Sequence, residues 1–336
     1  MPPAEHFGFP VETIVIFSVS VVVSLYLDLF AHRKHQAITV KNATAWSVFW
    51  ITLALLFYVY LGLRFKWEWA DLYLAGYVLE KSLSVDNLMV FMAIFTSFGI
   101  RSELQHRILY WGILGALALR ALFVVIGTSL FAASPYVGFL FAAFVIWSAF
   151  KMLQTIGKKN VDIEDYSDHW SVRLTKRFFA IYPKLLECQF FVAHAKIPPE
   201  HHNLVTQKAA FYATPAFLCL IAIEASDLAF AFDSVPAVIA VTQEPLLVYA
   251  AMIFAILGLR SLYFVLIALT RYLAHLDKAV IALLFFIGFK MALQAYNHAI
   301  ADSGLHIPNN VSLMIVLGTL LAGVVISLIF PGKKEK

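Results

Sequence analysis

Long runs of apolar residues dominate this sequence and restrict the folds that it can form. A helix needs about 20 apolar residues to cross the hydrocarbon core of a bilayer. Hydrophobic residues make up 61% of the chain and charged residues only 14%, which is far from the balance of a soluble domain. The sequence therefore predicts an all-α polytopic membrane protein of about nine transmembrane helices. The expected spans are 11–31, 44–64, 70–98, 108–131, 136–157, 209–241, 247–270, 279–297 and 311–330.

Basic residues are distributed unequally between the two sides that these spans define. If the N-terminus lies outside, eighteen Lys and Arg residues fall in cytoplasmic segments, and only Arg64 and Lys66 fall on the opposite side. Cytoplasmic loops of membrane proteins are enriched in basic residues. We therefore expect an outside N-terminus and a cytoplasmic C-terminus. The first residues lack the basic region and cleavage site of a secretory signal, so the first span is expected to be retained.

One long polar segment divides the spans into groups. The expected parts are two N-terminal transmembrane helices (1–69), transmembrane repeat 1 (70–157), a cytoplasmic loop (158–208), transmembrane repeat 2 (209–297), and a C-terminal transmembrane helix with a basic tail (298–336). The loop contains the aromatic and basic stretch "VRLTKRFFAIYPK" (172–184), which we expect to lie on the membrane surface. A metal-sensing role for His194, His201 and His202 is the alternative.

The two halves of the chain resemble each other. "GALALRALFVVIG" (115–127) is similar to "AILGLRSLYFVLI" (255–267), and "FVIWSAFKMLQ" (144–154) is similar to "LLFFIGFKMALQ" (283–294). In each half, a span with acidic residues is followed by a span with an arginine and then by a span with a lysine. These are called the acidic, arginine and lysine helices. Because each repeat has three membrane spans, an odd number, the second repeat enters the membrane from the other side. This pattern predicts two inverted three-helix repeats, whereas the alternative is simple duplication of a helical hairpin.

The acidic spans are expected to be interrupted helices. Both are longer than a straight span needs, and Pro215 and Pro236 stand near the ends of the second one. Glu80 and Asp86 are six residues apart, as are Asp227 and Asp233, which places each pair about 120° apart on an unbroken helix. Unwinding between the members would let both face one cavity.

Five carboxylates within these spans require compensation, because an aspartate at the bilayer centre costs about 2.5–3.5 kcal/mol on insertion scales. One interpretation is static pairing with the charge partners Lys81, Arg120 and Arg260. The other is a metal site, in which asparagine and serine oxygens add to the carboxylates. Such hard oxygen ligands suit Mg²⁺, Ca²⁺ or Mn²⁺. The predicted ligands are Glu80, Asp86, Asn87, Glu224, Asp227, Asp233 and Ser234.

Several motifs carry a resemblance to a known family. The stretches "EKSLSVDN", "EASD", "FAFDSVPA", "AILGLR" and "GFKM" resemble those of the TerC family of integral membrane proteins, and the chain as a whole is similar to its Alx-type members. The similarity keeps motif order and spacing over most of the chain. The resemblance implies paired three-helix repeats, Mn²⁺ efflux as the function, and metal binding by the five acids. The family is named for tellurium resistance, but the acidic core argues against an oxyanion as the direct substrate.

These observations favour a Mn²⁺ exporter of the bacterial inner (cell) membrane, working by alternating access with protons as counter-ion; Ca²⁺ and Mg²⁺ stay open as substrates. The alternative is a membrane partner protein that assists metalation or assembly of exported proteins through 158–208. No nucleophile–base constellation or phosphate loop accompanies the acids, so we expect no enzyme activity, no cofactor and no nucleic-acid partner. Five acids against Arg120 and Arg260 disfavour anion transport.

Overall fold

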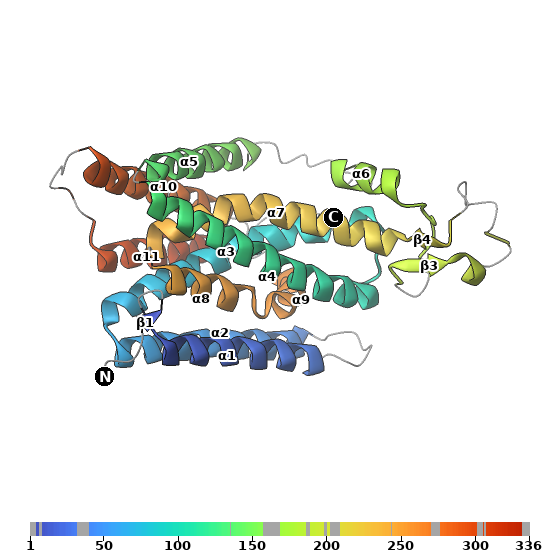
Figure 1. Cartoon of the computed structure of the whole chain (residues 1–336), viewed down its shortest axis with the longest axis horizontal. Coiled ribbons are helices and arrows are strands. Elements are labelled where there is room, and N and C mark those ends of the chain that lie inside the picture. The colour runs from blue at the N-terminus through green and yellow to red at the C-terminus, as the bar shows by residue number, and fades with distance from the viewer. Residues whose placement is uncertain are drawn as a thin grey trace. The chain divides into compact units, whose positions relative to one another are not determined.

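The structure consists mainly of long α-helices (Figure 1). The computed structural model describes residues 5–6, 9–31, 40–134, 136–156, 169–185, 189–197, 200–201, 209–242, 244–269, 276–300, 305 and 307–330. The helices are α1 (Val11–Ala31), α2 (Val40–Arg64), α3 (Trp67–Ser97), α4 (Ser102–Ala133), α5 (Val137–Ile156), α6 (Trp170–Phe178), α7 (Pro215–Thr242), α8 (Pro245–Ile256), α9 (Leu259–Leu269), α10 (Leu276–Ala299) and α11 (Asn309–Ile329). Two short antiparallel hairpins pair β1 (Glu5–His6) with β2 (Phe9–Pro10) and β3 (Phe191–Ala193) with β4 (Phe211–Ala213).

Within the described residues, six helices are long and apolar enough to cross a membrane: α2, α4, α5, α7, α10 and α11. The bent pair α8 and α9 would make a seventh span. Each of the other two predicted spans also contains a helix, but α1 has the shorter apolar stretch Val11–Ser24, and α3 carries Glu80, Lys81 and Asp86 near its middle. The all-α polytopic class is therefore confirmed, while the count of nine spans stays a prediction.

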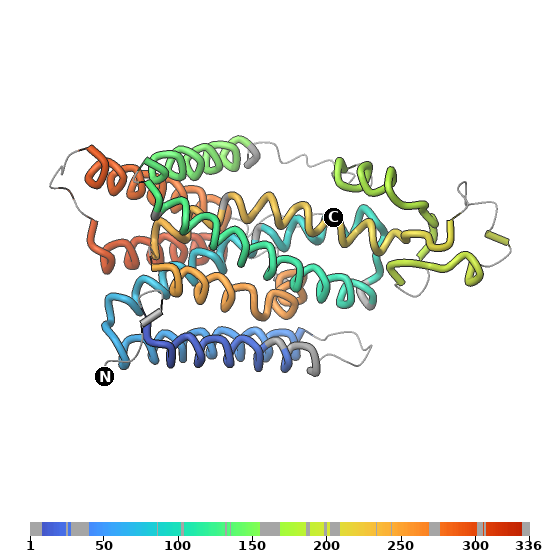
Figure 2. The backbone as a smooth tube through the Cα atoms, viewed as in Figure 1, coloured from blue at the N-terminus to red at the C-terminus, as the bar shows by residue number. Residues whose placement is uncertain are grey.

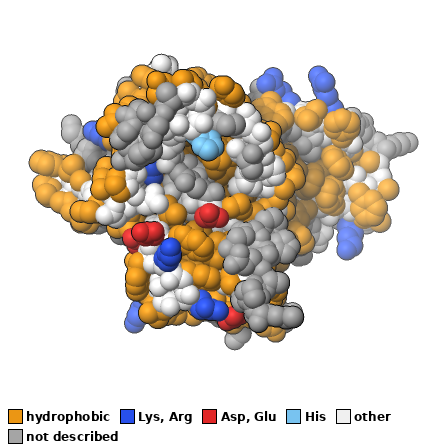
Figure 3. Space-filling model, turned by 60° about the vertical axis from the view of Figure 1, so that its left-hand side comes forward, with side chains coloured by type: hydrophobic (Ala, Val, Ile, Leu, Met, Phe, Trp, Pro, Cys, Tyr) orange, Lys and Arg blue, Asp and Glu red, His pale blue; other side chains and the backbone are white. Residues whose placement is uncertain are grey.

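Apolar side chains point outward as well as inward. Leu63, Met314 and Leu321 are among the large hydrophobic residues that stay exposed, and hydrophobic side chains cover much of the face shown in Figure 3. A soluble monomer rarely exposes apolar surface on this scale. The distribution is that of helices whose outer faces contact lipid.

Contacts between Cα atoms divide the chain into two compact units. Unit 1 comprises Met1–Asp86, Leu117–Lys159 and Ala231–Lys336, and unit 2 comprises Asn87–Ala116 and Asn160–Phe230. The helices α3, α4 and α7 each contribute residues to both units. Most of the predicted site residues consequently fall into two groups, one for each unit.

Unit 1 contains the lysine helices of both sequence repeats, and they pack against each other. A Cβ atom on Gly138 of α5 would lie 2.9 Å from Cβ of Ala295 on α10, and one on Gly288 of α10 would lie 2.5 Å from the Ile146 side chain of α5. The start of α5 thus meets the end of α10, so the two helices run antiparallel. This is the direction that inverted repeats require, although the repeat itself stays a prediction.

The expectation that the acidic helices are interrupted is wrong. Both α3 and α7 are continuous α-helices (Figure 2). Pro236 lies inside α7. Membrane helices tolerate an internal proline when neighbouring groups compensate for the lost hydrogen bond. Polar side chains also find hydrogen-bond partners without unwinding of the helix. The hydroxyls of Ser84 and Ser226 donate to the carbonyls of Glu80 and Ala222 one turn earlier.

The interruption lies in the second arginine helix instead. α8 ends at Ile256, α9 begins at Leu259, and the two are bent by 49°. Gly258 between them has φ +79°, a conformation that residues with a side chain rarely adopt. The equivalent residue of the first repeat is Ala118, and there α4 continues without a break.

Candidate cation site

Most of the predicted ligands lie in the described part of the structure. Asp86 and Asp233 are at helical positions of α3 and α7, but their side chains lie outside the described residues. The remaining residues divide between the two units. Glu80, Lys81, Arg120, Ser234 and Arg260 belong to unit 1, whereas Asn87, Glu224 and Asp227 belong to unit 2.

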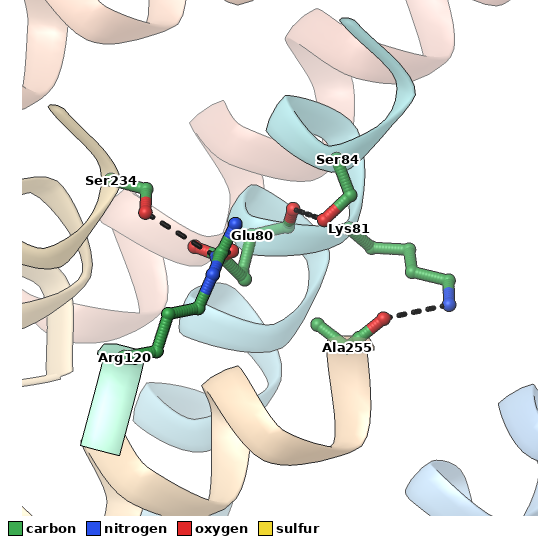
Figure 4. A network of polar contacts seen from close by, with 6 residues as sticks. All are labelled: Glu80, Lys81, Ser84, Arg120, Ser234 and Ala255. Carbon is green, nitrogen blue, oxygen red and sulfur yellow. Dashed lines mark hydrogen bonds and ion pairs between the residues drawn. The ribbon is translucent and has the colours of Figure 1, made fainter. Parts of the chain in front are cut away.

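In unit 1, Glu80 of α3 forms an ion pair with Arg120 of α4 (Figure 4). Both side chains are removed from solvent, with 0% of Glu80 and 2% of Arg120 exposed. Arg120 Nη1 also donates a long hydrogen bond, 3.5 Å, to Ser234 Oγ of α7. The Arg120 guanidinium therefore neutralises a carboxylate inside the bundle and joins three helices through one side chain.

Lys81, the neighbour of Glu80, bonds the backbone at the helix break. Its Nζ donates to the carbonyl oxygens of Ala255 at 2.9 Å and Leu257 at 3.4 Å. These carbonyls belong to the C-terminal end of α8, where the break removes their helical partners. A cation is favourable at a helix C-terminus because the helix dipole is negative there. Lys81 thus caps the broken helix.

In unit 2, two carboxylates lie one turn apart on α7. Asp227 is 2% exposed, whereas Glu224 is half-buried. Side chains three residues apart are neighbours on a helix surface, and like charges there repel. A cation shared between the two carboxylates would remove this repulsion. Asn87, which begins unit 2, is also buried.

A glycine of α4 makes room for one of these carboxylates. A Cβ atom on Gly115 would occupy the position of the Glu224 carboxyl group. One turn earlier, a Cβ atom on Gly112 would lie 3.1 Å from Ile223 Cγ2. The small residues Gly112 and Gly115 therefore let α4 approach α7 closely where Glu224 lies.

Arg260 is also buried, with 1% of its surface exposed, just after the break at the start of α9. Among the described residues, no group of three or more His, Cys, Asp and Glu side chains is close enough together to hold a metal ion. The side chains of Asp86 and Asp233, two of the five predicted carboxylate ligands, are not among the described ones.

Gly258 and Trp50 were missed by sequence reasoning, as was the position of Gly115 beside Glu224. An isolated glycine within an apolar helical segment is the one available signal, since it marks a bend or a close approach. Both glycines show that signal, in "ILGAL" and "ILGLR". Trp50, which packs against Gly258, gives no local signal because it lies in another helix.

We expect Gly115→Ala to destabilise the protein relative to Gly318→Ala. Gly318 of α11 has nothing within 4 Å of an added Cβ atom, so its replacement gains helix propensity, up to about 1 kcal/mol. Gly115→Ala gains the same propensity but displaces the Glu224 carboxylate, which makes it less stable than the control by about 1–3 kcal/mol. Unfolding in detergent measures both.

A double-mutant cycle checks the cause. In a Glu224→Ala background, Gly115→Ala and Gly318→Ala should have equal effects. A difference that persists without the Glu224 side chain would contradict the assignment of Gly115 as the residue that makes room for it.

The fold and these residues define a class: an all-α integral membrane protein with paired and clustered charges buried inside its bundle. The model of the integral membrane protein TerC family matches residues 65–335, and the chain belongs to this family. It is 50% identical to "Tellurium resistance protein TerC" of Serratia marcescens, over 99% of this chain and 98% of that protein.

More distant relatives cover nearly the same length. "Uncharacterized membrane protein STKORF319" of Myxococcus xanthus is 36% identical, over 93% of this chain and 91% of the relative. "Putative membrane-bound redox modulator Alx" of Escherichia coli (strain K12) is 34% identical, over 93% and 92%. No solved structure matches the chain with significance.

Proposed function

We propose that this protein exports a divalent metal cation, with Mn²⁺ as the substrate, across the inner membrane of a bacterium. The observation that carries the proposal is the carboxylate pair Glu224 and Asp227, one turn apart within an apolar membrane helix. Carboxylates in such a helix are costly, and they commonly mark an ion pathway. Glu224 and Asp227 bind the cation during its passage.

The ligand chemistry supports a hard divalent cation. Carboxylate, amide and hydroxyl oxygens suit Mn²⁺, Mg²⁺ and Ca²⁺, and the choice of Mn²⁺ follows from the family resemblance. The names of the relatives refer to tellurium resistance and to redox modulation. An acidic site repels a tellurium oxyanion, so the proposal for this chain is metal cation transport and not oxyanion binding or catalysis.

Alternating access and proton exchange complete the proposal. Transporters built from inverted repeats place their sites on discontinuous helices, and the α8–α9 break supplies one discontinuous helix. Moving a divalent cation outward against 100 mV costs about 4.6 kcal/mol, twice roughly 2.3 kcal/mol per charge. Inward proton flow can supply this energy, so dissipating the proton gradient should stop export.

Asp227→Asn is expected to reduce Mn²⁺ flux to the level of empty vesicles, because it removes the more deeply buried charge of the pair. The measurement is Mn²⁺ uptake into proteoliposomes, with Ca²⁺ and Mg²⁺ compared in parallel. Glu12→Gln is the matched control: it also removes one carboxylate charge, but Glu12 is exposed on α1. Its flux should equal that of the unmodified protein.

Equal Mn²⁺ flux in Asp227→Asn and Glu12→Gln would mean that the buried acids are structural. Absence of flux in the unmodified protein would favour the other candidate, a membrane partner that assists metalation or assembly of exported proteins.

A further inference from the structure

Helix α6 has an exposed apolar face although it lies outside the membrane-spanning helices. Trp170, Leu174 and Phe178 recur every four residues, and 54%, 47% and 76% of their surfaces are exposed. The residues of α6 that are buried are Ser171, Val172 and Thr175, which are mostly small or polar. This helix therefore packs against the rest of unit 2 through its more polar side, and its aromatic side faces outward.

The basic residues of α6 flank this apolar face. At about 100° per residue, Trp170, Leu174 and Phe178 span an arc of about 80°. Arg173 and Arg177 lie on one border of that arc, with Lys176 beyond them, and the buried residues lie on the other border. All three basic side chains are exposed. An apolar sector bordered by cations is the pattern of helices that lie in a membrane interface.

Aromatic contacts within unit 2 join the end of α6 to the start of a membrane span. The ring of Phe179, directly after α6, lies 5.7 Å from Phe191 and 5.6 Å from Phe217, and the rings of Phe191 and Phe217 are 4.5 Å apart. Phe217 is in the first turn of α7. The α6 helix is therefore fixed close to the level at which α7 enters the membrane.

A second contact reaches another span. The guanidinium of Arg107, in the second turn of α4, lies 5.6 Å from the centre of the Phe190 ring, and Phe190 precedes strand β3. The segment that carries α6 is thus tied to the beginnings of both α4 and α7 in unit 2. Tryptophan and other aromatic residues are favoured at this level of a bilayer.

We propose that α6 is an interfacial anchor that binds the anionic phospholipids of the surrounding membrane. Trp170, Leu174 and Phe178 enter the boundary between headgroups and acyl chains, and Arg173, Lys176 and Arg177 contact lipid phosphates. Cations next to a membrane surface are attracted by anionic lipids, which matches the charge of this border. The anchor holds the start of α7 at a fixed depth and is independent of the transport proposal.

The test compares two sides of α6 in the full-length chain. Single cysteines replace Leu174 or Lys176 in a background of Cys188→Ser and Cys219→Ala, and each carries a spin label. The protein is placed in nanodiscs with and without phosphatidylglycerol. Collision rates with oxygen, which concentrates in lipid, and with a water-soluble nickel chelate report the depth of each label. Gel filtration verifies that each variant is folded.

We expect the ratio of oxygen to nickel collisions to be several-fold higher at Leu174→Cys than at Lys176→Cys in anionic nanodiscs. Replacing Arg173 and Arg177 with glutamine, or omitting the anionic lipid, should lower the Leu174→Cys ratio. Equal ratios at the two positions would overturn the proposal. A label at position 174 that is shielded from both reagents would also overturn it, because a protein partner or a second copy would then cover this face. Immersion that is unchanged without anionic lipid would overturn the headgroup assignment.

Discussion

Replacing Glu80 with glutamine will lower the free energy of unfolding by about 3–5 kcal/mol, because it removes the carboxylate charge that pairs with the Arg120 guanidinium inside the bundle. Glu80 and Arg120 form an ion pair with almost no exposure to solvent. This carboxylate offsets part of the cost of removing the arginine from water. Reversible unfolding in mixed micelles gives the free-energy difference, and thermal unfolding in detergent ranks the variants.

The chain contains a matched control for this prediction. Glu12 and Arg64 form an ion pair at 3.5 Å in which both side chains are about half exposed. An exposed pair contributes about 0–1 kcal/mol, so Glu12→Gln removes the same charge with little loss of stability. Similar losses from Glu12→Gln and Glu80→Gln would contradict the role assigned to burial.

The double variant Glu80→Leu with Arg120→Met separates stability from function. Replacing both members of a buried ion pair with apolar residues of similar size is often neutral or stabilising, so its unfolding free energy should return close to that of the unmodified protein. If Glu80 also binds the transported cation, the double variant will be stable and inactive. A double variant as unstable as Glu80→Gln would show that the pair is not the source of the loss.

The helices were predictable because the membrane imposes one length and one composition on each span. All nine expected apolar segments contain helices, and the largest differences are at helix starts: α4 begins at Ser102 instead of residue 108, and α7 begins at Pro215 instead of 209. Helix ends depend on local capping and on loops, neither of which the hydrophobic pattern determines.

The partners of the buried charges were not predictable from spacing. Five acids and three basic residues allow many pairings, and only the fold brings Glu80 to Arg120 across forty positions of sequence. Lys81 was expected to compensate an acid, and the structure places it on carbonyl oxygens of α8. Those carbonyls become available only because the helix breaks between α8 and α9. The sequence pattern placed the break in the acidic helices, so it did not predict carbonyl partners for Lys81.

The location of the break shows how a nonlocal contact decides a local structure. The prolines of the α7 segment favoured an interruption there, since proline disrupts helices in water. In the structure α7 is continuous, and the helix is interrupted at Gly258 instead, where Trp50 of α2 packs against the glycine. Lys81 of α3 then caps the free carbonyls. Residues from two other helices therefore maintain the interruption, and neither is near Gly258 in sequence.

Gly258→Ala will destabilise the protein by about 2–5 kcal/mol, which combines two separable costs. A positive φ costs a residue with a side chain about 1–2 kcal/mol, and the added Cβ atom would overlap the Trp50 ring, which costs a further 1–3 kcal/mol or so. Gly99 supplies the control, because it also has a positive φ, +59°, but nothing lies within 4 Å of an added Cβ atom. Gly99→Ala should therefore show the backbone cost alone.

Combining Gly258→Ala with Trp50→Ala tests the second cost. Trp50→Ala alone leaves a cavity and destabilises by about 3–5 kcal/mol, but in the double variant the new methyl group no longer meets an indole ring. The double variant should therefore be more stable than the sum of the two single effects predicts, by roughly the overpacking cost of 1–3 kcal/mol. Additive effects would mean that the Trp50 side chain moves to accommodate the alanine at no steric cost. In that case the positive φ of Gly258 and the Lys81 cap, and not the Trp50 contact, would keep α8 and α9 apart.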